Sequence, residues 1–241
     1  MKSLRQEFAV LGLALLIGVG TTGKAQAQKQ SMYPKMGPVD SYLMPRDAEI
    51  ALARSAAPES ISRDAEVLVM TRQGYETAAK GSNGFVCIVQ RSWTAPSDDP
   101  EFWNPKVRAP ICYNQPAARS YLLGVVKETE LALGGRSGEQ ISEAIKADLD
   151  AKRLPALESG SMCYMMSKDG YLNDKVGHWH SHLMFLVPET DEKLWGANLR
   201  NSPILASKDD NEHVTVFMIP IGKWSDGTSA PPMNDDQNGQ P

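Results

Sequence analysis

The stretch SMCYMMSKDGYLNDKVGHWHSHLMFLV, residues 161–187, contains two apolar segments on either side of a polar turn. Segments 161–167 and 177–187 have the length of strands, and KDGYLND between them is rich in the Gly, Asn and Asp that favour turns. We therefore predict a β-hairpin. This hairpin decides the fold class, because the chain around it alternates between groups of strands and groups of helices.

Further strands are expected on both sides of a central helical region. The segments predicted as strands are 65–70, 74–80, 84–93, 202–207 and 213–224. The segments predicted as helices are 45–58, 117–133 and 137–152, with a short helix within 190–199. Ser137 and Gln140 have the spacing of a capping box, which marks the start of the third helix. The first three strands are expected to form an antiparallel meander, with 74–80 as an edge strand between the other two.

Grouped strands favour an antiparallel sheet over a doubly wound parallel one. The predicted fold is α+β: a single domain with a mainly antiparallel β-sheet, a helical hairpin inserted mid-chain and a short N-terminal helix. No internal repeat is visible.

The N-terminus has the layout of a secretory signal peptide. Basic residues Lys2 and Arg5 precede an apolar run from Phe8 to Gly20, and the small residues Ala25 and Ala27 suit cleavage. The run is shorter than the roughly 20 residues that span a bilayer. We expect residues 1–27 to be cleaved, 28–224 to form the domain and 225–241 to be a disordered tail. The expected location is periplasmic or secreted, with a retained N-terminal anchor as the alternative.

The net charge of the chain and the absence of several sequence motifs exclude some classes of function. The formal charge of −4 becomes −6 when residues 1–27 are removed, and no basic cluster is present, so nucleic acid and an anionic membrane are not expected partners. The sequence contains no GxGxxG, P-loop, GxSxG or HExxH motif. A small-molecule substrate or ligand remains compatible with the composition, and the sequence does not indicate the oligomeric state.

Three cysteines are present in a chain that we expect to be exported, where disulfides can form. Cys87 and Cys112 are a candidate pair, although sequence alone does not determine connectivity. The alternative is that Cys87, Cys112 and Cys163 are all buried thiols.

Residues 94–116 form a long segment with five prolines, which exclude regular structure over most of its length. Its aromatic residues Phe102, Trp103 and Tyr113 argue against disorder. We expect either a lid or wall over a site, or an ordered wrap that covers one face of the sheet.

His178, His180 and His182 are three of the four histidines of the chain. On a regular strand they would share one face with Met184 and Leu186. Neighbours on that face are about 6.6 Å apart, so two of the three can reach one metal ion while the outer pair cannot. The remaining ligands must come from elsewhere, or the strand must bulge. Zinc, copper and iron all accept imidazole ligands.

The hairpin suggests where further ligands lie. If paired positions sum to about 345, Cys163 lies opposite His182 and Met165 opposite His180, which suits copper. A slip of one residue would reverse the face. His213 is a second candidate ligand. The acidic residues of the long loop, Asp98, Asp99 and Glu101, are a third set.

The leading hypothesis is an exported metal-binding protein in which His178 and His180 hold a divalent transition metal (zinc, copper or iron). His182 is either a ligand or, if the protein is an enzyme, the general base next to the metal. A less favoured alternative makes Cys163 a nucleophile with a histidine base. The rival hypothesis is a non-catalytic binding protein of the cell envelope, with structural or pH-sensing histidines.

Overall fold

The computed structural model describes residues 32–231 except Val176, His178 and Trp179. Within these residues the chain forms a single α+β domain on one mostly antiparallel sheet, which confirms the expected fold class. The strands are β1 (Glu66–Thr71), β2 (Gly74–Ala79), β3 (Val86–Gln90), β4 (Ala109–Tyr113), β5 (Met162–Met165), β6 (His182–Pro188), β7 (Leu205–Asp209) and β8 (Val214–Pro220). The α-helices are α1 (Arg46–Arg54), α2 (Glu59–Ser62), α3 (Gln115–Arg119), α4 (Tyr121–Leu133) and α5 (Gly138–Asp150). Short 3₁₀ helices are η1 (Val39–Ser41), η2 (Ser92–Thr94) and η3 (Glu192–Trp195).

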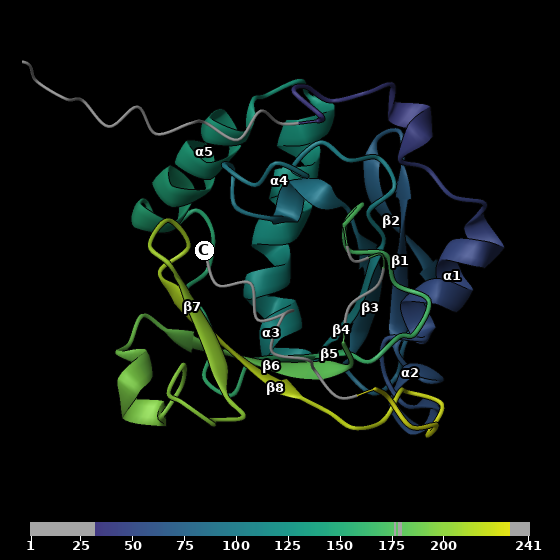
Figure 1. The fold of residues 1–241 in the computed structure, drawn as a ribbon. Coiled ribbons are helices and arrows are strands. Elements are labelled where there is room, and N and C mark those ends of the chain that lie inside the picture. The colour runs from purple at the N-terminus through teal and green to yellow at the C-terminus, as the bar shows by residue number, and fades with distance from the viewer. Residues whose placement is uncertain (1–31, 176, 178–179, 232–241) are drawn as a thin grey trace, which may run out of the picture.

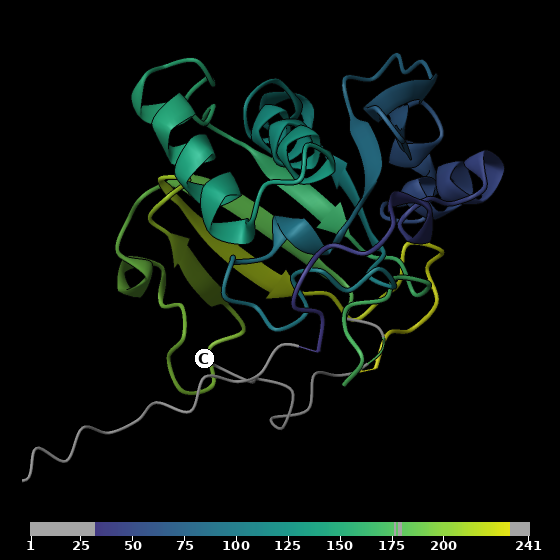
Figure 2. The same cartoon turned by 90° about the horizontal axis from the view of Figure 1, so that it is seen from above.

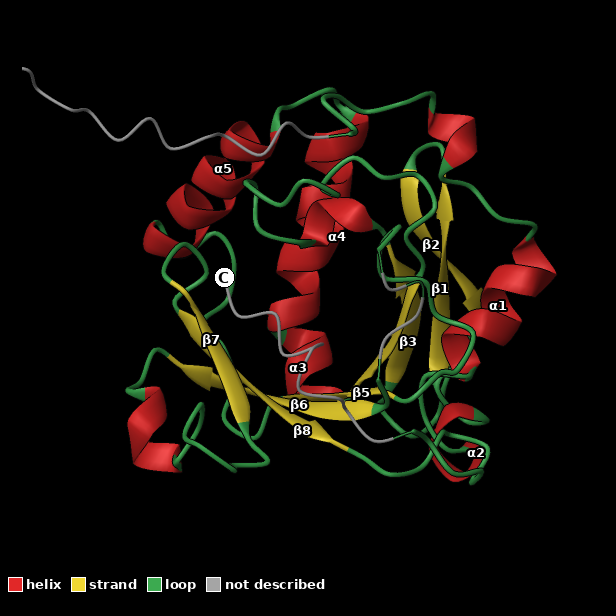
Figure 3. Cartoon of the chain, in the orientation of Figure 1, coloured by secondary structure: helices red, strands yellow, loops and turns green. Residues whose placement is uncertain are grey.

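The sheet curves around α4. Its strand order is β2-β1-β3-β4-β5-β6-β8-β7, and β1 to β3 stand beside α4 while β6 and β8 pass below it (Figure 1). Seen from above, α4 lies between α5 and the β1–β2 side of the sheet (Figure 2). The helices and strands are distinguished by colour in Figure 3. The curvature leaves one concave face, which α3 and α4 fill.

Apolar clusters cover both faces of the sheet. On the concave face, Ile88 and Ile111 of the sheet pack with Leu122 and Val125 of α4. On the opposite face, the alanine-rich side of α1 packs on β1 and β3, because its small side chains allow a close approach. Each face therefore has its own helical cover, as a layered α+β domain requires.

The predicted antiparallel meander over 65–93 is wrong in its last step. β1 and β2 form the expected hairpin, but β3 pairs with β1 and runs parallel to it, with Glu66 opposite Val86. β2 lies at the edge of the sheet rather than between the other two strands. The physical reason is burial: four of the five β3 residues are buried, so β3 takes the interior position and the more exposed β2 takes the edge.

The long proline-rich segment lacks regular structure over most of its length, as predicted, but it contains a central strand that the sequence pattern does not predict. β4 lies between β3 and β5 even though Pro110 is one of its residues. Pro110 pairs with Val89 of β3, whereas β5 pairs only with Cys112 and Tyr113. The proline therefore stands where β4 has no β5 partner, and its missing N–H interrupts no bond between these two strands.

Cys87 and Cys112 form a disulfide, which confirms the candidate pair. The two residues lie directly opposite each other on β3 and β4, with Cα atoms 4.0 Å apart. Cys163 is a buried free thiol.

The aromatic residues of segment 94–108 are packed inward. Phe102 and Trp103 contact each other edge to face, and Trp103 also neighbours Trp93, which in turn contacts Tyr42. These rings form a third apolar cluster with Ile141 and Ile145 of α5. The segment is thus an ordered wrap, and its first residues border a cavity described below.

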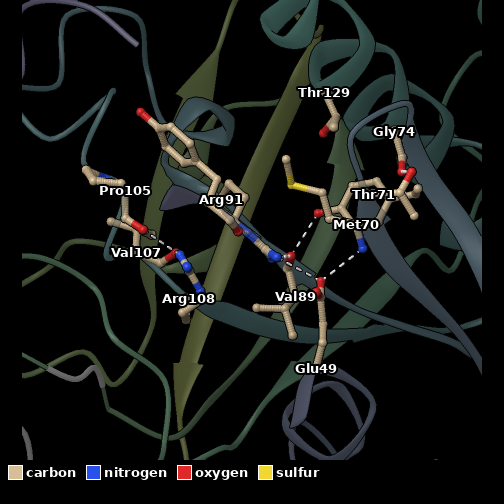
Figure 4. Close-up of polar contacts among 12 residues, drawn as sticks. Glu49, Met70, Thr71, Gly74, Val89, Arg91, Pro105, Val107, Arg108 and Thr129 are labelled. Carbon is tan, nitrogen blue, oxygen red and sulfur yellow. Dashed lines mark hydrogen bonds and ion pairs between the residues drawn. The ribbon is translucent and has the colours of Figure 1, made fainter. Parts of the chain in front are cut away.

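A buried ion pair connects α1 to the sheet (Figure 4). Arg91 follows β3, and its guanidinium lies 2.9 Å from the Oε1 atom of Glu49 on α1. The exposed fractions of these two side chains are 0% and 1%. Arg91 also donates to the carbonyl oxygens of Tyr42 and Val89, while the N–H of Met70 donates to Glu49. The N-terminal arm, α1, β1 and β3 therefore meet at one charged centre.

The folded part of the chain continues past the predicted boundary at Trp224. Trp224 is buried, the N–H of Ser225 donates to the carbonyl of Met166, and Lys168 pairs with Asp226. The rest of the predicted tail, 232–241, and the predicted signal peptide lie outside the described residues. Among the helices that the structure describes, none has the length and apolarity needed to cross a membrane.

Candidate functional site

The histidine segment lies at the start of β6 and not along it. His182 is the first residue of β6 and His180 precedes the strand, whereas His178 lies outside the described residues. The alternating geometry expected for three histidines on one regular strand therefore does not apply to His180. The contact between the two residues is instead one between the His182 ring and the backbone carbonyl of His180.

His182 is almost fully buried. Its Nδ1 atom lies 2.6 Å from the carbonyl oxygen of His180, and a carbonyl oxygen can only accept a hydrogen bond, so Nδ1 carries the proton. Burial lowers the pKa of His182 to about 4, which keeps the ring neutral at neutral pH. The ring nitrogen that retains a lone pair is then Nε2, which is the arrangement commonly found for histidine ligands of metals.

The predicted hairpin register is displaced by two residues. Met165 pairs with His182 and Cys163 with Met184, so paired positions sum to 347 rather than 345. Because the displacement is even, the prediction that Cys163 and Met165 share a sheet face with His182 is confirmed. Cys163 itself is one pair further along the strands than expected.

Cys163 is poorly suited to thiolate chemistry in this environment. Its side chain is fully buried, and burial raises the pKa of the thiol far above its ordinary value. A neutral thiol in an apolar cluster is a weak nucleophile and a weak metal ligand. The structure therefore places Cys163 among the core side chains of the concave face.

The structure does not bring His213 to His180 or His182. It precedes β8 at Val214, which pairs with Pro188, whereas His182 pairs with Pro220 at the far end of the same two strands. The separation along the strands is about 20 Å. The Nε2 atom of His213 lies 2.8 Å from Asp150 at the end of α5.

The acidic residues of the long loop are also dispersed. Asp99 accepts a hydrogen bond from the N–H of Glu101, and Glu101 accepts one from Asn104. A different acidic residue, Asp174, joins this loop to the hairpin by accepting from Lys106. In the part of the chain that the structure describes, no group of three or more His, Cys, Asp or Glu side chains could hold a metal ion.

A cavity of about 170 Å³ lies on the other side of the molecule, between α4, α5 and the turn that joins β7 to β8. Its walls combine aromatic, small and acidic side chains. They come from segment 93–98 with Phe102, from Tyr121 and Glu128 of α4, from Gly138, Ile141, Ser142 and Ile145 of α5, and from Asp209, Asn211 and Glu212 of the turn. None of the described residues that line it is Lys, Arg or His.

Two carboxyl groups meet at this cavity. Glu128 and Glu212 both line the cavity, close enough for their negative charges to interact. Burial, followed by the negative charge of Glu212, raises the pKa of Glu128 well above its ordinary value. Burial and the charge of Asp209 raise the pKa of Glu212 to about 7. Both shifts favour the protonated, uncharged form of these carboxyl groups.

Local structure positions both members of the pair. Glu128 lies two helical turns after Tyr121, so both side chains extend from one face of α4. Tyr121 and Glu212 both line the cavity and the smaller hollow beside it. Glu212 is held in its turn because Asp209 accepts hydrogen bonds from the N–H groups of Asn211 and Glu212. His213 then anchors the turn to α5 through Asp150.

The sequence pattern predicts only packing helices at 117–133 and 137–152, and a polar connection between strands at 208–212, with no functional residue in either. One signal was present: Glu128 interrupts the apolar face that Tyr121 and Val125 begin on the predicted helix 117–133. No such local signal marks Glu212. It lies near Glu128 only because the strand order of the sheet and the packing of the β7–β8 turn place it there.

Comparison with known proteins does not identify a relative. No family, curated protein or solved structure matches this chain, so the site is interpreted from its own geometry.

Proposed function

We propose that this protein is an exported binding protein whose ligand site is the cavity between α4, α5 and the β7–β8 turn. The observation that carries the proposal is that Glu128 and Glu212 both line a cavity whose described lining contains no basic residue. Carboxyl groups cost free energy when they are removed from water, and apolar side chains of similar size would stabilise the same fold better. Binding of a ligand by these carboxyl groups would account for their presence in the cavity.

The size of the cavity indicates a small ligand. About 170 Å³ is below the 300–1,000 Å³ that is usual for drug-sized molecules, and a cavity of about 150 Å³ can hold benzene. Ligands of roughly the size of benzylamine therefore match the available space. Gly138 and Phe102 both line the cavity and pack closely, because a Cβ atom on Gly138 would lie 3.0 Å from the Phe102 ring.

A pair of neighbouring tryptophan substitutions on α5 tests whether the cavity binds ligands. Ser142 lines the cavity, so Ser142→Trp fills it, whereas Glu143 is exposed and Glu143→Trp adds the same ring outside. Fragments that bind residues 28–241 in ligand-observed NMR should lose their signal with Ser142→Trp and keep it with Glu143→Trp. Fragments that bind both variants equally would place the ligand site elsewhere.

Export is supported by the basic start, apolar run and small residues of segment 1–27. N-terminal sequencing of protein from the periplasm or culture medium should begin near Gln28. Recovery of the intact chain with the cells would contradict this part of the proposal.

The orientation of His182 favours metal binding as a second candidate function. With Nδ1 donating to the carbonyl of His180, Nε2 is the lone-pair nitrogen. We propose His182 and His180 as ligands of zinc, copper or iron, with His178 as a further ligand whose position lies outside the described residues. Protein purified without a histidine tag should contain a stoichiometric ion, lost in His182→Ala and kept in His213→Ala. A metal-free wild type that shows no thermal shift with these ions would contradict the assignment.

A further inference from the structure

We infer that the cavity takes a small organic cation, an ammonium or guanidinium group with a short apolar portion, whose charged end lies against Glu128 and Glu212. The inference rests on the proposed binding function and names the class of ligand. Three features of the cavity carry it: the acidic character of its charged lining residues, the two glutamates that line the same space, and the apolar side chains beside them.

Every element around the cavity contributes either acidic or uncharged groups. Glu128 and Tyr121 come from α4, Asp209 and Glu212 from the turn, and Asp98 from the loop after η2. The described lining residues of α5 are uncharged. Two basic residues that are next to lining residues along the chain, Lys146 and His213, both contact Asp150 at the end of α5. A cationic ligand would therefore meet complementary charge, whereas an anion would meet only repulsion.

An apolar extension lies next to the carboxyl pair. A smaller hollow of about 30 Å³ shares Tyr121, Ile145 and Glu212 with the cavity. Its other walls are mainly apolar and include Leu149, Leu154 and Leu157. Trp93, Phe102 and Ile141 supply apolar walls on the cavity side. A ligand with a cationic head at the carboxyl groups could thus bury a hydrocarbon portion, which a bare metal ion lacks.

The presence of Glu128 and Glu212 in the lining of one cavity couples binding to proton release. Burial raises the pKa of both carboxyl groups, that of Glu212 to about 7. An ammonium group stabilises the ionised carboxylates, so a proton that the carboxyl groups hold leaves to water when the cation binds. The balance is one cation bound and up to one proton released, with no bond formed or broken in the ligand. Affinity should therefore rise with pH between about 6 and 8.

The test uses three ligands of matched shape: benzylamine, benzyl alcohol and benzoate. Calorimetric titration of residues 28–241 at pH 7.5 should show that benzylamine binds at least tenfold more tightly than the other two. Its affinity should fall at least tenfold with Glu212→Gln or with Glu128→Gln, while binding of benzyl alcohol changes little. Two substitutions are used so that poor folding of one does not decide the result. Repeating the titration in buffers of different ionisation enthalpy counts the protons released.

The possible failures are distinguishable. If benzyl alcohol or benzoate binds as tightly as benzylamine and Ser142→Trp abolishes that binding, the cavity is a ligand site but not a cation site, and only the present inference is overturned. If Ser142→Trp leaves all binding unchanged, or if none of the three ligands binds, the binding function fails with it. Saturable binding of CaCl₂ that competes with benzylamine would show an inorganic cation site and would also overturn the inference.

Discussion

At the residue scale, Arg91 and Glu49 show how one charged contact holds several segments. The pair is buried, and Arg91 also donates to backbone carbonyls of the N-terminal arm and of β3. An ion pair of this kind adds little net stability over apolar side chains of the same size, but removing one partner leaves the other charge without compensation. The contribution of this ion pair to stability is therefore seen mainly as the loss of stability when one partner is removed.

We expect Glu49→Gln to lower the free energy of unfolding by about 3–5 kcal/mol, because it leaves the Arg91 guanidinium buried without a counter-charge. Glu76→Gln is the matched control. It removes the partner of Arg46 in a pair whose side chains are about half exposed, and it should cost less than about 1 kcal/mol. Urea denaturation of both variants measures the two costs, and equal losses would contradict the role given to the buried pair.

At the element scale, the disulfide joins two neighbouring strands of the sheet. Cys87 and Cys112 are 25 positions apart, and the segment between them includes the aromatic wrap between β3 and β4. Closing a loop of this length reduces the conformational entropy of the unfolded chain. The bridge should therefore stabilise the fold chiefly through the unfolded state.

Replacing both cysteines, in Cys87→Ala/Cys112→Ala, should cost about 3 kcal/mol of stability. Wild-type protein unfolded in the presence of a reductant should show a similar loss. Thiol counting on denatured, unreduced protein should find one free thiol, from Cys163. Three thiols would show that the bridge does not form.

Helix α4 contains a glycine, Gly124, at a position where the surrounding side chains leave room for a larger residue. A Cβ atom on Gly124 would have no neighbour within 4 Å, so Gly124→Ala should raise stability by about 0.5–1 kcal/mol through helix propensity. Gly81 is the opposite case, because its Cβ would lie 2.1 Å from the backbone nitrogen of Glu66. Gly81→Ala should be strongly destabilising. Thermal melts that rank the two variants the other way would contradict the packing described here.

At the scale of the whole molecule, the carboxyl pair links stability to pH. In the folded protein the pKa of Glu212 is raised to about 7, so the folded state keeps a proton that the unfolded chain has already lost above about pH 4.5. The folded state therefore binds more protons in this window, and the free energy of unfolding falls as pH rises. Burial lowers the pKa of His182 and gives the opposite slope below about pH 6.5.

A comparison of Glu212→Gln with wild type isolates the contribution of the pair, because His182 is present in both. Between pH 5 and pH 8, the free energy of unfolding of the variant should increase by about 1–2 kcal/mol relative to that of the wild type. Urea denaturation at several pH values measures this difference. A constant difference would show that Glu212 titrates as an exposed carboxyl group.

The elements that sequence predicts well are those decided by local patterns. The helix expected from Ser137 is present, and Ser137 and Gln140 form the predicted capping box, because the bonds of a capping box lie within four residues. The hairpin of β5 and β6 and the face shared by Cys163 and His182 are likewise confirmed, since strand alternation preserves the face under an even shift. In these cases the controlling contacts are close along the chain.

The candidate site depended on contacts that the local pattern does not contain. Histidine spacing drew attention to the start of β6, where it predicted ligand atoms on a regular strand that in fact begins only at His182. The cavity needed Glu128 of α4 and Glu212 of the β7–β8 turn, which approach only after the sheet has curved around α4. No single segment signals such a pair, because each carboxyl group alone reads as an ordinary polar residue.

The sequence by itself determined the α+β class, the helix start at Ser137 and the candidate disulfide, because periodicity, capping and cysteine spacing are properties of short segments or of residue type. Only the tertiary structure decided that β3 runs parallel to β1, that Pro110 stands in a central strand and that two glutamates share a cavity. These features follow from burial and strand order, which are set by the free energy of the whole packed chain.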